Sequence, residues 1–113
     1  MRLSIIVPTL NEAANIAATL APLQPMRARG VEVIVADGGS TDATRAIAQP
    51  LADHLIDSAA GRARQMNAGA GVASGDALLF LHADSFLPAN ADLEIAAVLT
   101  NARWGRFDVT ICG

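Results

Sequence analysis

The chain has 113 residues, of which 52% are hydrophobic and 17% are charged, and its formal net charge is −3 at pH 7. A chain of this length can bury roughly 60 to 70% of the surface that it exposes when unfolded, which is enough for one hydrophobic core. The apolar composition excludes a disordered tail. The negative charge argues against a nucleic-acid-binding protein, because such proteins need a basic stripe along the phosphates.

The single cysteine, Cys112, leaves no internal disulfide bond to form. A structural zinc site would need more ligands than this cysteine with His54 and His82. Pro8 interrupts the first apolar run too early for a signal peptide, and no segment reaches the ~18 apolar residues of a membrane span. We therefore expect a cytoplasmic protein, whose membrane contact is either peripheral, at the inner face of the membrane, or made by residues outside this chain.

Short apolar runs rich in β-branched residues predict strands that are buried on both faces of a sheet. The runs span residues 3–7, 31–36 and 77–81, with a weaker one at 54–57. A further strand starts within residues 104–113, where no other element follows it. We therefore expect a domain that is cut short at this point.

Helical spacing separates the strands. Ile16, Leu20 and Leu23 recur at i, i+4 and i+7, with Asn11 as the expected N-cap and Pro22 near the far end. Further helices are predicted at residues 41–48 with Ser40 as the N-cap, at 62–73 after Gly61, and at 91–102.

Alternating strands and helices with short loops predict a Rossmann-like, doubly wound α/β fold. The sheet is expected to be mostly parallel, with helices on both faces. In such sheets ligands bind outside the carboxyl ends of the strands. The polar residues of this chain cluster there, so this edge is the expected site.

The turn after the first strand contains Pro8, Thr9, Asn11 and Glu12. One hydroxyl, one amide and one carboxylate in a turn can bind the hydrogen-bonding edges of a nucleoside. Asn11 taken alone is better explained as a helix cap, and Glu12 as an acid that complements the helix dipole.

The turn after the second strand begins with Asp37 and Gly38. The glycines of residues 38–39 permit a tight turn, which leaves the Asp37 carboxylate to face the crevice and accept hydrogen bonds from a base or ribose. The alternative is an Asp37 that bonds to its own backbone. Asp42 is interpreted as a partner of the helix dipole.

Arg64 and Asn67 share one face of the helix predicted at residues 62–73, beside an inward face of Ala63, Met66 and Ala70. Either Arg62 or Arg64 can bind a diphosphate through a charge-assisted fork. A solvated surface arginine is the alternative for each.

His82 and Asp84 flank Ala83 directly after the strand at residues 77–81. In extended backbone, residues i and i+2 point the same way, so both side chains can approach one cation. Asp84 supplies the hard oxygen that Mg²⁺ or Mn²⁺ prefers, and an imidazole favours Mn²⁺. The alternative is a histidine that merely ends the strand.

Four ordered motifs resemble the family-2 glycosyltransferases of the GT-A fold. They lie at residues 7–12, at 37–42, at Asn67 followed by 73–76, and at 80–84. The resemblance covers nearly the whole chain. His82 with residues 104–109 is similar to a subgroup linked by name to radical-SAM and selenium-domain clusters.

The resemblance implies that residues 1–113 are the nucleotide-sugar-binding part of a single GT-A domain. It implies inverting transfer of a sugar from a UDP- or GDP-sugar to an unknown acceptor hydroxyl, assisted by Mn²⁺ or Mg²⁺. The implied nucleotide-binding residues are Pro8, Thr9, Asn11, Glu12, Asp37, Gly38, Arg64, Asn67 and Ala83.

Asp84 resembles the retained acid of the family's Asp-x-Asp metal motif, whose first acid is His82 in this chain. This departure lowers the negative charge that is available to a dication. The general base of the family lies beyond the matched region, so we expect donor binding without turnover from these 113 residues. Detectable sugar transfer would contradict that expectation.

Other functions share parts of the pattern. A nicotinamide-dependent oxidoreductase needs Gly-x-Gly-x-x-Gly after its first strand, where this chain has residues 8–12 instead. A sugar nucleotidyltransferase needs a glycine-rich, basic loop after its first strand, and residues 8–12 of this chain do not form one. A non-catalytic nucleotide-binding or scaffold module of the same fold is the remaining alternative, and His82 is the residue that favours it.

Overall fold

A computed structural model of the chain describes residues 2–82, 87–88, 90–94 and 107–111, the last segment by its backbone alone. Its strands form one parallel sheet in the order β3-β2-β1-β4-β5. The strands are β1 (Leu3–Thr9), β2 (Glu32–Asp37), β3 (His54–Asp57), β4 (Ala77–Leu81) and β5 (Phe107–Ile111). The predicted parallel sheet is confirmed, and its carboxyl ends meet at one edge.

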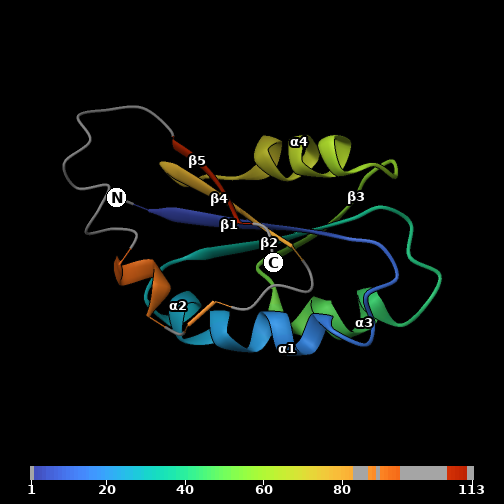
Figure 1. Cartoon of the computed structure of the whole chain (residues 1–113), viewed down its shortest axis with the longest axis horizontal. Helices are drawn as coiled ribbons and strands as arrows, with labels where there is room; N and C mark the ends of the chain where they lie inside the picture. Colours follow the sequence, from blue (N-terminus) through green and yellow to red (C-terminus); the bar gives the residue numbers. More distant parts are fainter. Residues whose placement is uncertain (1, 83–86, 89, 95–106, 112–113) are drawn as a thin grey trace.

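Helices cover both faces of the sheet, as the alternating pattern predicts (Figure 1). One face carries α1 (Ile16–Leu20), α2 (Gln24–Ala28) and α3 (Thr44–Ala48), and the other carries α4 (Arg62–Val72). Two short 3-10 helices, η1 (Ala21–Leu23) and η2 (Gln49–Leu51), continue α1 and α3. The result is a three-layer α/β fold of the Rossmann-like type.

The two faces of the sheet have separate cores, because successive side chains of a strand point to opposite sides. Ile5 and Val7 of β1 pack with Ile16 and Leu20 of α1 in the larger core. Ile6, between them, belongs to the smaller core beneath α4. The amphipathic spacing of the first helix therefore predicts its buried side correctly.

The first helical region is not one helix that ends at a proline. It divides into α1, η1 and α2, and Pro22 and Pro25 each occupy the first turn of the segment that follows. A proline has no N–H to donate and is tolerated in a first turn. These prolines therefore start new helical segments.

Neither predicted side-chain cap is present. The residue before α1 is Asn15 and the residue before α3 is Ala43, and neither makes a side-chain capping bond. Asn11 and Ser40 lie several residues earlier, in the loops. Local capping preference was the wrong guide because both side chains make contacts with a second loop instead.

The inward side of α4 agrees with the prediction in part, because Met66 and Ala70 pack against the smaller core. Gln65 and Gly69 are its buried residues, while Ala63 is exposed. A Cβ built on Gly69 would lie 2.4 Å from Cγ2 of Ile6. The helix therefore packs on the sheet through a glycine, which permits a closer approach than the predicted alanine face would.

A buried carboxylate closes the amino edge of the sheet. Glu32 accepts hydrogen bonds from Ser4 Oγ at 2.8 Å, from Ser74 N at 2.9 Å and from Ser74 Oγ at 3.1 Å. Burial raises the pKa of Glu32, but the hydrogen bonds from Ser74 and Ser4 outweigh it and the pKa is lowered. This cluster fixes the connection from α4 to β4.

The helix predicted at residues 91–102 is helical over residues 91–94, and its remainder lies outside the described residues. Within the described segments, none of the helices combines the length and the apolar character that crossing a bilayer requires.

Replacing Gly69 by alanine is expected to lower the free energy of unfolding by about 1–3 kcal/mol, because the new methyl group would overlap Ile6. Gly71 of the same helix is the matched control, since a Cβ there meets nothing within 4 Å. Gly71→Ala should be neutral or stabilising by up to about 1 kcal/mol. Urea unfolding of both variants measures the difference, and equal effects would contradict this packing.

Candidate functional site

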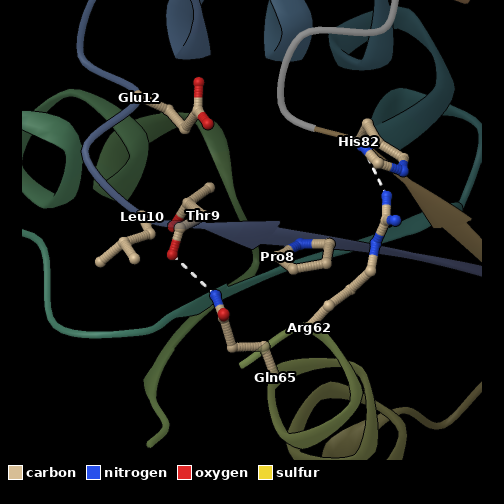
Figure 2. A pocket seen from close by; sticks show the side chains of 7 residues that line it. All are labelled: Pro8, Thr9, Leu10, Glu12, Arg62, Gln65 and His82. Atoms are coloured by element: carbon tan, nitrogen blue, oxygen red, sulfur yellow. Dashed lines mark hydrogen bonds between the residues drawn. The ribbon is translucent and has the colours of Figure 1, made fainter. Parts of the chain in front are cut away.

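A pocket of about 320 Å³ opens at the carboxyl edge of the sheet (Figure 2). Its walls come from the end of β1, the loop after it, the first turns of α4 and the residue after β4. The lining residues are Pro8, Thr9, Leu10, Glu12, Arg62, Gln65 and His82. The site therefore lies where the parallel topology predicts it.

The loop after β1 is joined to the loop after β2 by paired hydrogen bonds. Asn11 has a φ of 52°, a left-handed conformation that asparagine tolerates better than most residues. Its N–H donates to Ser40 Oγ at 2.9 Å, and its Oδ1 accepts from Thr41 N at 2.8 Å. The backbone N–H of Glu12 donates to Thr44 Oγ1 at 2.8 Å. These contacts hold the Glu12 backbone in place and leave its half-buried side chain in the pocket wall.

Asp37 is fully buried and organises the turn after β2. Its carboxylate accepts hydrogen bonds from Thr9 Oγ1 at 2.8 Å, Ser40 Oγ at 2.5 Å, Ser40 N at 2.8 Å and Gly39 N at 3.1 Å. Burial raises the pKa of this carboxyl, but the hydrogen bonds from Ser40, Thr9 and Gly39 outweigh it and the pKa lies below its usual range. The expectation that Asp37 faces the crevice is therefore wrong, because these donors turn it into the loop.

Gln65 forms the floor of the pocket and was not predicted. Its Nε2 donates to the carbonyl oxygens of Thr9 at 2.7 Å and Ala36 at 2.9 Å, the residues near the ends of β1 and β2. A Cβ built on Gly38 would lie 2.9 Å from the Gln65 side chain, so a larger residue at that position would displace the amide from its two acceptors. No local sequence signal marks Gln65, because both acceptors lie far away along the chain.

Arg62 crosses the pocket to the end of β4 (Figure 2). Its Nη2 lies 2.6 Å from Nδ1 of His82. Glu12 stands on the opposite wall of the same pocket. The pocket thus has an acidic wall and a basic wall above a floor that is already hydrogen-bonded, which suits an elongated ligand with hydroxyl or N–H groups at one end and an anion at the other.

The structure brings together four of the predicted site residues in the pocket: Pro8, Thr9, Glu12 and His82. Asn11, Asp37 and Gly38 shape the loops behind it. Arg64 and Asn67 are exposed on α4 and do not line the pocket. Arg62 takes the position expected of Arg64. Gly61, directly before α4, has a φ of 127°, a conformation that favours glycine. This residue sets the direction in which α4 begins, and the spacing of residues within the helix cannot reveal that direction.

Ala83 and Asp84 lie outside the described residues. Among the side chains that are described, no group of three His, Cys, Asp or Glu residues is arranged to hold a metal ion. Nδ1 of His82 faces a guanidinium, which is a donor and carries positive charge. This geometry does not fit a dication at Nδ1, and the expectation that His82 is a metal ligand stays a prediction.

Gln65→Leu is expected to destabilise the fold by about 1–3 kcal/mol, because two buried carbonyl groups lose a donor. Asn67→Ala, at an exposed position of the same helix, should change the stability by less than about 0.5 kcal/mol. Unfolding of both variants in urea measures the two effects. A tolerated Gln65→Leu would show that the floor does not depend on this amide.

Asp37→Asn is expected to weaken the acid sensitivity of the fold. Because the folded-state pKa of Asp37 is lowered, its ionised form stabilises the fold above the unfolded pKa of about 3.9, and this stabilisation is lost as the pH falls below that value. The variant should be less stable near neutral pH, and its free energy of unfolding should decline less steeply below about pH 4. Urea unfolding across a pH series gives both slopes, and identical slopes would contradict the assignment.

Comparison with known proteins identifies relatives in sequence and in structure. A PGL/p-HBAD biosynthesis glycosyltransferase of Mycobacterium tuberculosis is 35% identical over 127 residues, covering 90% of this chain and 50% of the relative. The chain thus spans about half the length of the curated relatives that it matches over most of its own length.

Two solved structures resemble the chain closely. S. aureus TarS 1–349 in complex with UDP-GlcNAc has a TM-score of 0.76 and 25% identity, over 88% of this chain and 31% of that one. The mannosyltransferase PcManGT from Pyrobaculum calidifontis, in complex with GDP-Man and Mn²⁺, has a TM-score of 0.74 and 27% identity, over 88% of this chain and 32% of that one. The subgroup expected from His82 and residues 104–109 stays a prediction. The model of the family described as glycosyl transferase family 2 matches residues 4–112, and the chain therefore belongs to that family.

Proposed function

We propose that residues 1–113 form the donor-binding part of a single GT-A domain that transfers a sugar from a UDP- or GDP-sugar to an acceptor hydroxyl. The observation that carries the proposal is the pocket at the carboxyl edge, with Glu12 on one wall and Arg62 on the other. Family membership and the nucleotide sugars named for the two related structures support it.

The two walls suit the two ends of a nucleoside diphosphate. A carboxylate such as Glu12 accepts hydrogen bonds from ribose hydroxyl groups or a base N–H. A guanidinium such as Arg62 forms charge-assisted, forked hydrogen bonds to phosphate oxygens. The ligand would therefore lie with its nucleoside toward Glu12 and its diphosphate toward Arg62.

The proposed transfer proceeds with inversion at the anomeric carbon, the course that the family resemblance implies. The acceptor oxygen forms a bond to that carbon while the bond to the diphosphate oxygen breaks, and the nucleoside diphosphate leaves with the electron pair. The acceptor proton passes to a general base that we do not assign. The contribution of Arg62 is electrostatic, because it offsets the negative charge that grows on the leaving diphosphate.

A divalent cation forms a finer part of the proposal. Mn²⁺ is present in the PcManGT complex, and Asp84 would offer a hard oxygen to Mn²⁺ or Mg²⁺. Such an ion supplies Lewis-acid stabilisation of the diphosphate when it is bound. His82 is left out of the proposed ligands because its Nδ1 faces Arg62.

Calorimetric titration of the chain with UDP and with GDP, each with and without Mn²⁺, tests the donor class. We expect one of the two to bind, and Glu12→Ala to weaken that binding by about 10- to 100-fold through loss of hydrogen bonds to a charged acceptor. Glu94→Ala, at an exposed position outside the pocket, is the control and should bind as the unmodified chain does. Failure of both nucleotides to bind under every condition would contradict the proposed function.

A further inference from the structure

The contact between Arg62 and His82 gives this pocket a property beyond donor binding. We propose that Arg62, positioned by His82, binds the diphosphate of the donor whether or not a divalent cation is present. His82 is then a positioning residue for an arginine and not a metal ligand. The proposal rests on the proposed function, since it concerns how the same pocket holds the same nucleotide.

The direction of the hydrogen bond follows from the chemistry of the two side chains. Nη2 of Arg62 and Nδ1 of His82 are 2.6 Å apart. A guanidinium has only donors, so Nδ1 of the imidazole must be the acceptor. In an imidazole that accepts at Nδ1, the proton is on Nε2 and the ring is neutral. His82 therefore orients Arg62 without cancelling its positive charge.

The residue type at position 82 decides how much of the Arg62 charge remains available to a ligand. An aspartate in this place, as in the Asp-x-Asp motif that residues 82–84 resemble, would form an ion pair with Arg62. The guanidinium charge would then be largely offset before any ligand arrived. The neutral imidazole orients the same guanidinium and leaves its charge for an anionic ligand.

The surroundings of the Arg62 guanidinium also favour an anionic ligand. The ion pairs within the described part of the chain involve Arg27, Arg29, Arg45 and His54, and none includes Arg62. Arg62 is also the first residue of α4, whose first turn contains no acidic side chain. A cation at a helix N-terminus is opposed by the helix dipole, and a bound anion would relieve that opposition.

The shape of the pocket places Arg62 and Glu12 on opposite walls. Arg62 reaches across it from α4, and Glu12 faces it from the loop after β1 (Figure 2). A nucleoside diphosphate whose ribose or base reaches Glu12 places its phosphates on the Arg62 side. The cationic contribution to diphosphate binding is then already built into the protein.

Titration with UDP and GDP in the presence of EDTA tests the proposal directly. We expect the nucleotide that binds with Mn²⁺ to bind also in EDTA, with no more than about a fivefold loss of affinity. Arg62→Gln should weaken binding in EDTA by about tenfold or more, the value of a hydrogen bond to a charged group. Arg64→Gln, an exposed neighbour outside the pocket, is the matched control and should change the affinity less than about twofold.

Variants of His82 test its role as a positioning residue. His82→Asn keeps an acceptor for Arg62 and should retain binding in EDTA, whereas His82→Leu removes the acceptor and should lose it. His82→Asp should weaken binding in EDTA because the new carboxylate offsets Arg62. Each variant is first shown to unfold at the same urea concentration as the unmodified chain, and uridine is titrated beside UDP because only the diphosphate should report on Arg62.

The outcomes separate the two proposals. Binding that requires Mn²⁺, or that is unchanged in Arg62→Gln, overturns the proposal about Arg62 and His82 and leaves the proposed function standing. Absence of nucleotide binding both with Mn²⁺ and in EDTA overturns the proposed function itself. Equal affinities of His82→Asn and His82→Leu in EDTA would overturn the positioning role of His82.

Discussion

The carboxyl edge of the sheet depends on one buried amide, that of Gln65. It donates to backbone carbonyls of β1 and β2 at the same time and fixes the beginning of α4 against both strands. A buried amide that makes good hydrogen bonds is held in one geometry, because any displacement leaves polar groups without partners. Arg62 lies less than one helical turn earlier and inherits its position from this contact.

Each edge of the sheet has a buried carboxylate that joins segments of the chain. At the amino edge, Glu32 accepts from Ser4 and Ser74 and closes a connection. At the carboxyl edge, Asp37 does the same for the two loops, which leaves Glu12 and Arg62 directed into the pocket. The structural charge and the charges that we propose for ligand binding are thus carried by different residues at the carboxyl edge. A change in one need not disturb the other.

Periodicity predicted the strands, the burial of α1 and the edge at which the site lies, because these follow from which residues are apolar. It failed where a side chain reaches a distant partner. Asn11 and Ser40 have the composition of helix caps but bond to one another's loops. Arg64 was expected in the site where Arg62 stands, since the turn at Gly61 sets the start of α4. The contact of His82 with Arg62 was not foreseen, because the two residues lie 20 positions apart in the sequence.

The close approach of Gly38 to Gln65 has a consequence for how this site can diverge. No side chain can be added at position 38 while the glutamine keeps its place, since even a methyl carbon would lie 2.9 Å from it. A residue with a Cβ at position 38 would therefore require either a shift of the Gln65 side chain or a smaller residue at position 65. Substitutions at positions 38 and 65 are therefore coupled. Ligand preference can change more readily through the residues of the pocket walls, where a single substitution can be accepted by itself.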